Sequence, residues 1–195
     1  MKSLLAVLLL VATSVSASPI SDVDRYVAEK MGDHLIPGLA LVVIRDGQVV
    51  HRRGFGELDS TQPIIIGSLS KAITATAVMT LVEDGRIELD APMHRYLPGV
   101  SFDDPRMQGV TVRQLLHQTS GLPTHAPRAD SRDARLSDHI EALRGARLIS
   151  KPGERHVYSS PNYQLLGRIV EVVSGGSFGS YVRSRILDPL QMSSS

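Results

Sequence analysis

The chain has 195 residues, no cysteine and a formal net charge of +1. The absence of cysteine excludes thiol catalysis, thiolate metal ligands and disulfides. The balanced charge gives no reason to expect nucleic acid or an anionic membrane as a partner. The seven histidines show neither HExxH nor HxH spacing, so we expect no metal or other cofactor.

Residues 1–17 are typical of a secretory signal peptide. Lys2 precedes an apolar run over residues 4–11, and Val15, Ser16 and Ala17 form a small-residue cleavage site. The run is too short to span a membrane, and no later run is long enough. We therefore expect residues 18–195 to be exported, to the periplasm or outside the cell, without a membrane anchor of their own. Losing Lys2 takes the formal charge from +1 to 0.

The first predicted elements are a helix and a β-hairpin. Ser21 caps a helix that runs to about residue 33. Its expected buried stripe consists of Val23, Tyr26, Val27, Met31 and Leu35. A β-branched run over 39–45, an Asp-Gly turn and a partner strand over 48–53 follow. This order favours an α+β fold in which an antiparallel sheet is flanked by helices.

The second predicted helix, over residues 69–84, is apolar nearly all round. Three threonines are the only polar residues between Lys71 and Glu83. Such a helix belongs in a core, and Gly85 is expected to end it. Ser68 therefore stands at the start of a buried central helix.

The remaining elements are shorter and are predicted mainly from their caps. We expect a loop over 89–99, a helix capped by Thr111 through 117, an exposed loop over 124–135 and an amphipathic helix over 137–147. Pro161 begins a helix over 162–174. Its inward-facing residues are Leu165, Leu166, Ile169, Val170 and Val173. Two glycines end it, and Ser177 caps a last helix to about residue 187.

Ser68 and Lys71 are the first candidate catalytic residues. Residues three apart lie on one face of a helix, one turn apart. Burial and the positive helix N-terminus both disfavour an ammonium, so we expect Lys71 to favour its neutral form and to activate Ser68 as a nucleophile. The alternative is that Ser68 is a helix cap and Lys71 a surface residue. Ser70 is a rival nucleophile that points to another face.

Tyr158 is the second candidate, because a phenol near two positive groups loses its proton more easily and can relay one to a leaving group. The alternative is a core tyrosine with a polar tip. Residues 175–179 also fit GxSxG, the nucleophile elbow of another hydrolase fold. That elbow joins a strand to a helix, whereas two helices are predicted here, so we interpret Ser177 as a cap.

Three sequence segments, which follow one another along the chain, together indicate a protein family. They read Ile-Gly-Ser-Leu-Ser-Lys over 66–71, Leu-Leu-His-Gln-Thr-Ser-Gly-Leu-Pro over 115–123 and Tyr-Ser-Ser-Pro-Asn-Tyr-Gln-Leu-Leu-Gly over 158–167. With them the chain resembles the serine β-lactamase-related family, which contains class C β-lactamases, penicillin-binding proteins, D-aminopeptidases and esterases. The resemblance covers residues 36–192.

The resemblance implies a β-lactamase/transpeptidase-like fold and an exported serine hydrolase. It would form an acyl-enzyme at Ser68, with Lys71 as proton acceptor and Tyr158 as the second acid/base. The backbone N–H of Ser68 would be half of the oxyanion hole. The implied substrates are small molecules or peptides: β-lactams, D-amino-acid peptides or esters.

Two departures from the family pattern matter. The Tyr-x-Asn motif ends in Ser160, a shorter hydrogen-bonding residue that we still expect to bind substrate. The third motif, Lys-Thr-Gly or His-x-Gly, does not occur in residues 18–195. We therefore expect 18–195 to be the N-terminal portion, about the first half, of the domain. An alternative function follows: a truncated or degenerate relative that only binds a ligand or a partner.

Overall fold

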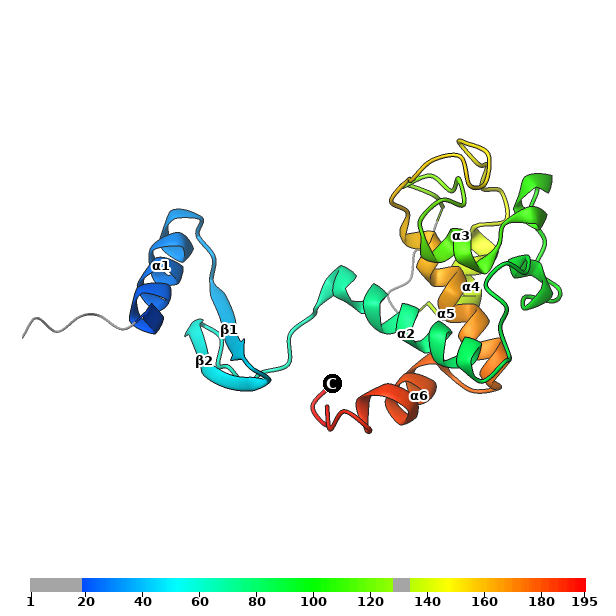
Figure 1. Cartoon of the computed structure of the whole chain (residues 1–195). Coiled ribbons are helices and arrows are strands. Elements are labelled where there is room, and N and C mark those ends of the chain that lie inside the picture. Colours follow the sequence, from blue (N-terminus) through cyan, green and yellow to red (C-terminus); the bar gives the residue numbers. More distant parts are fainter. Residues whose placement is uncertain (1–18, 128–133) are drawn as a thin grey trace, which may run out of the picture. The chain divides into compact units, whose positions relative to one another are not determined.

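The computed structural model describes residues 19–127 and 134–195, which fall into two compact units that divide after Ile64 (Figure 1). The predicted signal peptide over 1–17 lies outside the described residues, as does part of the predicted loop over 124–135. Within the described ranges, no helix is long and apolar enough to cross a membrane.

The first unit contains a helix and the predicted hairpin. Helix α1 spans Pro19–Asp33, and strands β1 (Gly38–Arg45) and β2 (Gln48–Gly56) pair antiparallel. The two turn residues, Asp46 and Gly47, have φ of +50° and +74°, the left-handed conformation that a two-residue hairpin turn needs. The hairpin prediction is therefore confirmed, and β1 and β2 form the sheet of the described residues.

The predicted buried stripe of α1 is wrong for most of its residues. Met31 is buried, whereas Tyr26 is 61% exposed and Leu35 is 89% exposed. Helix α1 contacts β2 through polar side chains instead. Asp24 forms hydrogen bonds with His51 Nε2 at 2.8 Å and with the Arg53 guanidinium at 2.6 Å. A two-stranded sheet offers too little surface to bury a full helical stripe.

The second unit is helical. After a 3₁₀ turn over Gly67–Leu69, its helices are α2 (Ser70–Glu83), α3 (Val112–Leu116), α4 (Leu136–Ala142), α5 (Ser160–Ser174) and α6 (Phe178–Val182), the last continuing as a π turn over Arg183–Leu187. Thr111 forms a capping box with Gln114, and Gly175 ends α5 with a φ of +80°. Helix α4 ends five residues earlier than predicted, where i→i−3 hydrogen bonds tighten the chain around Leu143.

The core of this unit surrounds α5, against which α2, α3, α4 and α6 pack (Figure 1). Four of the five predicted inward residues of α5 are fully buried, and Val173 is half-buried against the same core. The predicted loop over 89–99 also contributes Met93 and Leu97, both nearly inaccessible.

The prediction that α2 is buried on all sides is wrong. Thr74, Ala77, Val78 and Leu81 are buried. Met79 is 39% exposed and Leu69, before the helix, is 71% exposed. Within its own unit α2 packs against α5, α6 and the π turn over Arg183–Leu187, and these contacts leave part of its surface exposed.

Candidate active site

Ser68 lies where the 3₁₀ turn leads into α2. Gly67 begins this turn with a φ of +53°, a conformation that favours glycine. One turn later Lys71 projects on the same face, and its Nζ donates a hydrogen bond to Ser68 Oγ at 3.0 Å. The predicted spacing therefore brings the hydroxyl and the amine into contact. Ser68 is exposed and Lys71 is half-buried.

Tyr158 reaches the same hydroxyl from the segment before α5. Its OH lies 2.7 Å from Ser68 Oγ, although the two residues are 90 positions apart. Hydrogen bonding from Lys71 is the main cause that lowers the pKa of the Tyr158 phenol below its usual value, and the Ser68 hydroxyl adds to it. Lys71 Nζ also lies 4.9 Å from the centroid of the Tyr158 ring.

A second tyrosine, Tyr163, lies beside the site, and its phenol pKa is raised rather than lowered. Lys71 Nζ lies 5.8 Å from the ring centroid of Tyr163, and the Tyr163 hydroxyl donates to the carbonyl of Leu116 at 3.0 Å. Burial is the main cause that raises the pKa of the Tyr163 phenol. The surroundings therefore shift the pKa values of the two phenols in opposite directions, and the lowered one is in contact with Ser68.

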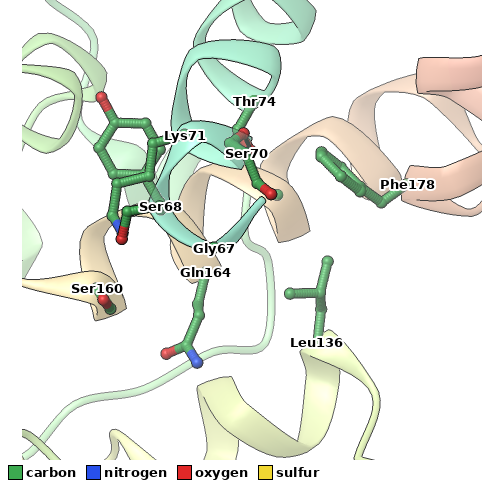
Figure 2. Close-up of a pocket in the computed structure, with 11 residues that line it drawn as sticks. Gly67, Ser68, Ser70, Lys71, Thr74, Leu136, Ser160, Gln164 and Phe178 are labelled. Carbon is green, nitrogen blue, oxygen red and sulfur yellow. Dashed lines mark hydrogen bonds between the residues drawn. The ribbon is translucent and has the colours of Figure 1, made fainter. Parts of the chain in front are cut away.

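The site opens into a cavity of about 330 Å³ (Figure 2). Ser160, the first residue of α5, lines it together with Ser68, Ser70 and Lys71. The hydrogen bonds of Lys71 and Tyr158 converge on the Ser68 hydroxyl rather than on the rival Ser70. Ser177 lies elsewhere and caps α6 by accepting from the backbone N–H of Ser180, as predicted.

A buried polar network behind Tyr158 was not predicted. The Oε1 atom of Gln118 accepts from Asn162 Nδ2 at 2.6 Å and from the backbone N–H of Ser159 at 3.0 Å. Ser120 Oγ donates to Asn162 Oδ1 at 2.6 Å. The side chains of Ser120 and Asn162 are inaccessible to solvent, and Gln118 is 7% exposed.

The network fixes the backbone on both sides of Tyr158. The N–H of Val157 donates to the carbonyl of Gln118 at 2.8 Å, and the hydroxyl of Thr124 donates to the carbonyl of Tyr158 at 2.7 Å. The signal that could have revealed it is Asn162 inside the apolar stripe of a helix, because a buried amide needs partners. The described residues contain no group of three His, Cys, Asp or Glu side chains that could hold a metal ion.

The sequence and the fold of the chain are similar to those of known proteins. The sequence matches the beta-lactamase family over residues 23–195. It is 35% identical over 167 residues to penicillin-binding protein 4 of Amycolatopsis lactamdurans, an alignment that covers 81% of this chain and 44% of the relative.

Two solved structures extend the comparison. The octameric penicillin-binding protein homologue from Pyrococcus abyssi superposes with a TM-score of 0.78 at 33% identity, over 90% of this chain and 44% of that one. The D-amino acid amidase from Ochrobactrum anthropi gives a TM-score of 0.69 at 27% identity, over 87% and 50%. The chain thus has a β-lactamase/transpeptidase-like fold.

The chain belongs to the beta-lactamase family, as the match over residues 23–195 shows. It spans 36% to 44% of the length of the curated relatives it matches. Its relatives include penicillin-binding proteins and an amidase.

Proposed function

We propose that this protein is an exported serine hydrolase in which Ser68 is the acylated nucleophile. One observation carries the proposal: Ser68 Oγ lies 3.0 Å from Lys71 Nζ and 2.7 Å from Tyr158 OH. A nucleophile within hydrogen-bond reach of two groups that can exchange protons is the arrangement that covalent acyl transfer requires.

The first half of the reaction is acylation. Lys71 Nζ takes the proton from Ser68 Oγ while that oxygen attacks the substrate carbonyl carbon. The backbone N–H of Ser68, in the first turn of the helical segment, hydrogen-bonds the resulting oxyanion. The Tyr158 phenol gives its proton to the departing nitrogen or oxygen and is reprotonated from Lys71, so the carbonyl–leaving-group bond breaks and a serine ester remains.

The second half is deacylation. A water molecule attacks the ester carbon and passes a proton to the Lys71–Tyr158 pair, and Ser68 Oγ leaves with a proton from the same pair. Ser160 lines the cavity, and in the proposed reaction its hydroxyl hydrogen-bonds the bound substrate.

The proposed substrates are β-lactams, D-amino-acid peptides or esters. One relative is a penicillin-binding protein, a second is a penicillin-binding protein homologue, and a third is a D-amino acid amidase. The proposal of export rests on the leader-like residues 1–17.

Covalent labelling tests the nucleophile. The full-length gene product is incubated with a fluorescent penicillin or a fluorophosphonate, and the intact mass is measured for the wild type, Ser68→Ala and the matched control Ser70→Ala. We expect one adduct on the wild type and on Ser70→Ala, and none on Ser68→Ala. Labelling that survives Ser68→Ala contradicts the proposal. The absence of any adduct also contradicts it and favours a relative that only binds.

A further inference from the structure

The cavity beside Ser68 has two chemically different ends. Figure 2 shows Ser68, Lys71 and Ser160 on one side of it and the apolar side chains of Leu136 and Phe178 on the other. Leu136 belongs to α4 and Phe178 to α6, and both of these helices pack on α5. Among the described residues that line the cavity, Lys71 alone is charged.

Gly167 of α5 keeps this apolar end open. A Cβ atom at position 167 would lie 3.1 Å from Leu136 Cδ1 and 3.7 Å from Phe178 Cδ2. The first distance is tighter than ordinary van der Waals contact, so an added methyl group would fill space between these side chains and push Leu136. Glycine inside a helix costs about 0.5–1 kcal/mol relative to alanine, and here it leaves room that alanine would occupy.

The position of the proton-transferring groups decides which part of a substrate faces this space. In the proposed reaction Tyr158 protonates the leaving group, so the leaving group lies on the Tyr158 side of Ser68 Oγ. The acyl group then extends away from Tyr158. Ser70 separates Ser68 and Lys71 from Phe178 in the view of Figure 2, and the apolar end lies beyond it.

We propose that this cavity binds the acyl group of the substrate and selects compact apolar acyl groups. The inference rests on the proposed function, because it assigns a specificity pocket to the same nucleophile. The volume of about 330 Å³ is near the lower end of the range of roughly 300–1,000 Å³ for small-molecule pockets. Leu136 and Phe178 offer no partner for a charged group, so charged acyl groups are disfavoured.

Two p-nitrophenyl esters that differ only in acyl length test the pocket. Acetate and butanoate esters differ by two methylenes, and each buried methylene favours binding about fourfold. We expect the full-length protein to form the Ser68 adduct from the butanoate ester ~15-fold faster than from the acetate ester, after correction for hydrolysis without protein.

Three variants make the test specific. Gly167→Ala is expected to lower the butanoate-to-acetate ratio to ~4-fold or less, since its methyl group occupies the space of about one methylene. Gly179→Ala is the matched control, because it adds the same methyl group to a helix with nothing within 4 Å, and the ratio should stay as in the wild type. Leu136→Ala lengthens the pocket and should raise the rate with the hexanoate ester relative to the butanoate ester.

The outcomes separate the two proposals. Equal rates with both esters would overturn the proposed acyl pocket. The same would follow if Gly167→Ala and Gly179→Ala gave the same butanoate-to-acetate ratio. Neither result would contradict the proposal of a serine hydrolase. If none of the esters gives an adduct at Ser68, the proposed function falls and the pocket assignment falls with it.

Discussion

Gln118 is the residue whose replacement should most clearly reveal the network behind Tyr158. Its Oε1 atom accepts from the N–H of Ser159 and from the Nδ2 of Asn162, and both donors are inaccessible to solvent. Gln118→Met keeps a side chain of similar length and removes the acceptor. Both buried donors then lose this partner.

The expected cost follows from these two donors. A buried donor left without a partner costs about 1–3 kcal/mol, so Gln118→Met should lower the free energy of unfolding by about 4 kcal/mol. For a protein of this size 1 kcal/mol corresponds to roughly 2–4 °C in melting temperature, so we expect a decrease of ~8–16 °C. The acylation rate should also fall, because Ser159 and Val157 hold Tyr158 in place.

The assay is thermal and urea unfolding of the full-length protein. The matched control is Gln108→Met, which replaces an exposed glutamine and should change stability by less than about 0.5 kcal/mol. Adding Asn162→Leu to Gln118→Met should cost less than the sum of the single changes, by about 1–3 kcal/mol, because the two side chains share one hydrogen bond. Equal stability of Gln118→Met and Gln108→Met would show that the two buried donors do not depend on Gln118.

Three further predictions concern the site and the core. Tyr158→Phe should slow acylation of Ser68 by about 10²–10⁴-fold, measured by intact mass against time, and an unchanged rate would remove Tyr158 from the mechanism. Lys71→Met should raise the pKa of the Tyr158 phenol, because hydrogen bonding from Lys71 is the main cause that lowers it. The titration of tyrosinate absorbance, with Tyr158→Phe as reference, should therefore shift to higher pH. A titration curve that does not move would contradict the pairing of Lys71 with Tyr158. Asp104 is 3% exposed, and its hydrogen bonds to Arg106 lower its pKa in the folded state, so it stabilises the fold above the ordinary carboxyl pKa of about 3.9. The loss of melting temperature in Asp104→Asn should therefore be full at pH 7 and should shrink as the pH falls below that pKa. A loss that does not depend on pH would contradict this origin.

Features that depend on neighbouring residues could be predicted from the sequence. The capping box at Thr111, the left-handed end of α5 at Gly175 and the hairpin turn at Asp46 and Gly47 are set within a few residues. The contact between Ser68 and Lys71 belongs to the same class, because residues three apart on a helix always face the same way.

Features that depend on tertiary packing could not be predicted in this way. The apolar stripe of α1 is a necessary condition for burial, but the area of the facing element decides how much of Tyr26 and Leu35 is covered. The contact of Tyr158 with Ser68 joins residues 90 positions apart, and only the resemblance to a family indicated it. Asn162 in the apolar stripe of α5 indicates a buried polar network, but nothing in the sequence identifies Gln118 as its partner or places Gly167 opposite Leu136.

In the proposed reaction Ser68, and no neighbouring hydroxyl, carries the acyl group. The most direct test is to trap the adduct with a fluorescent penicillin, digest the protein and locate the modified residue by tandem mass spectrometry. We expect modification at Ser68, the hydroxyl that Lys71 and Tyr158 both contact. Modification at Ser70 or Ser177, or at no serine, would contradict it.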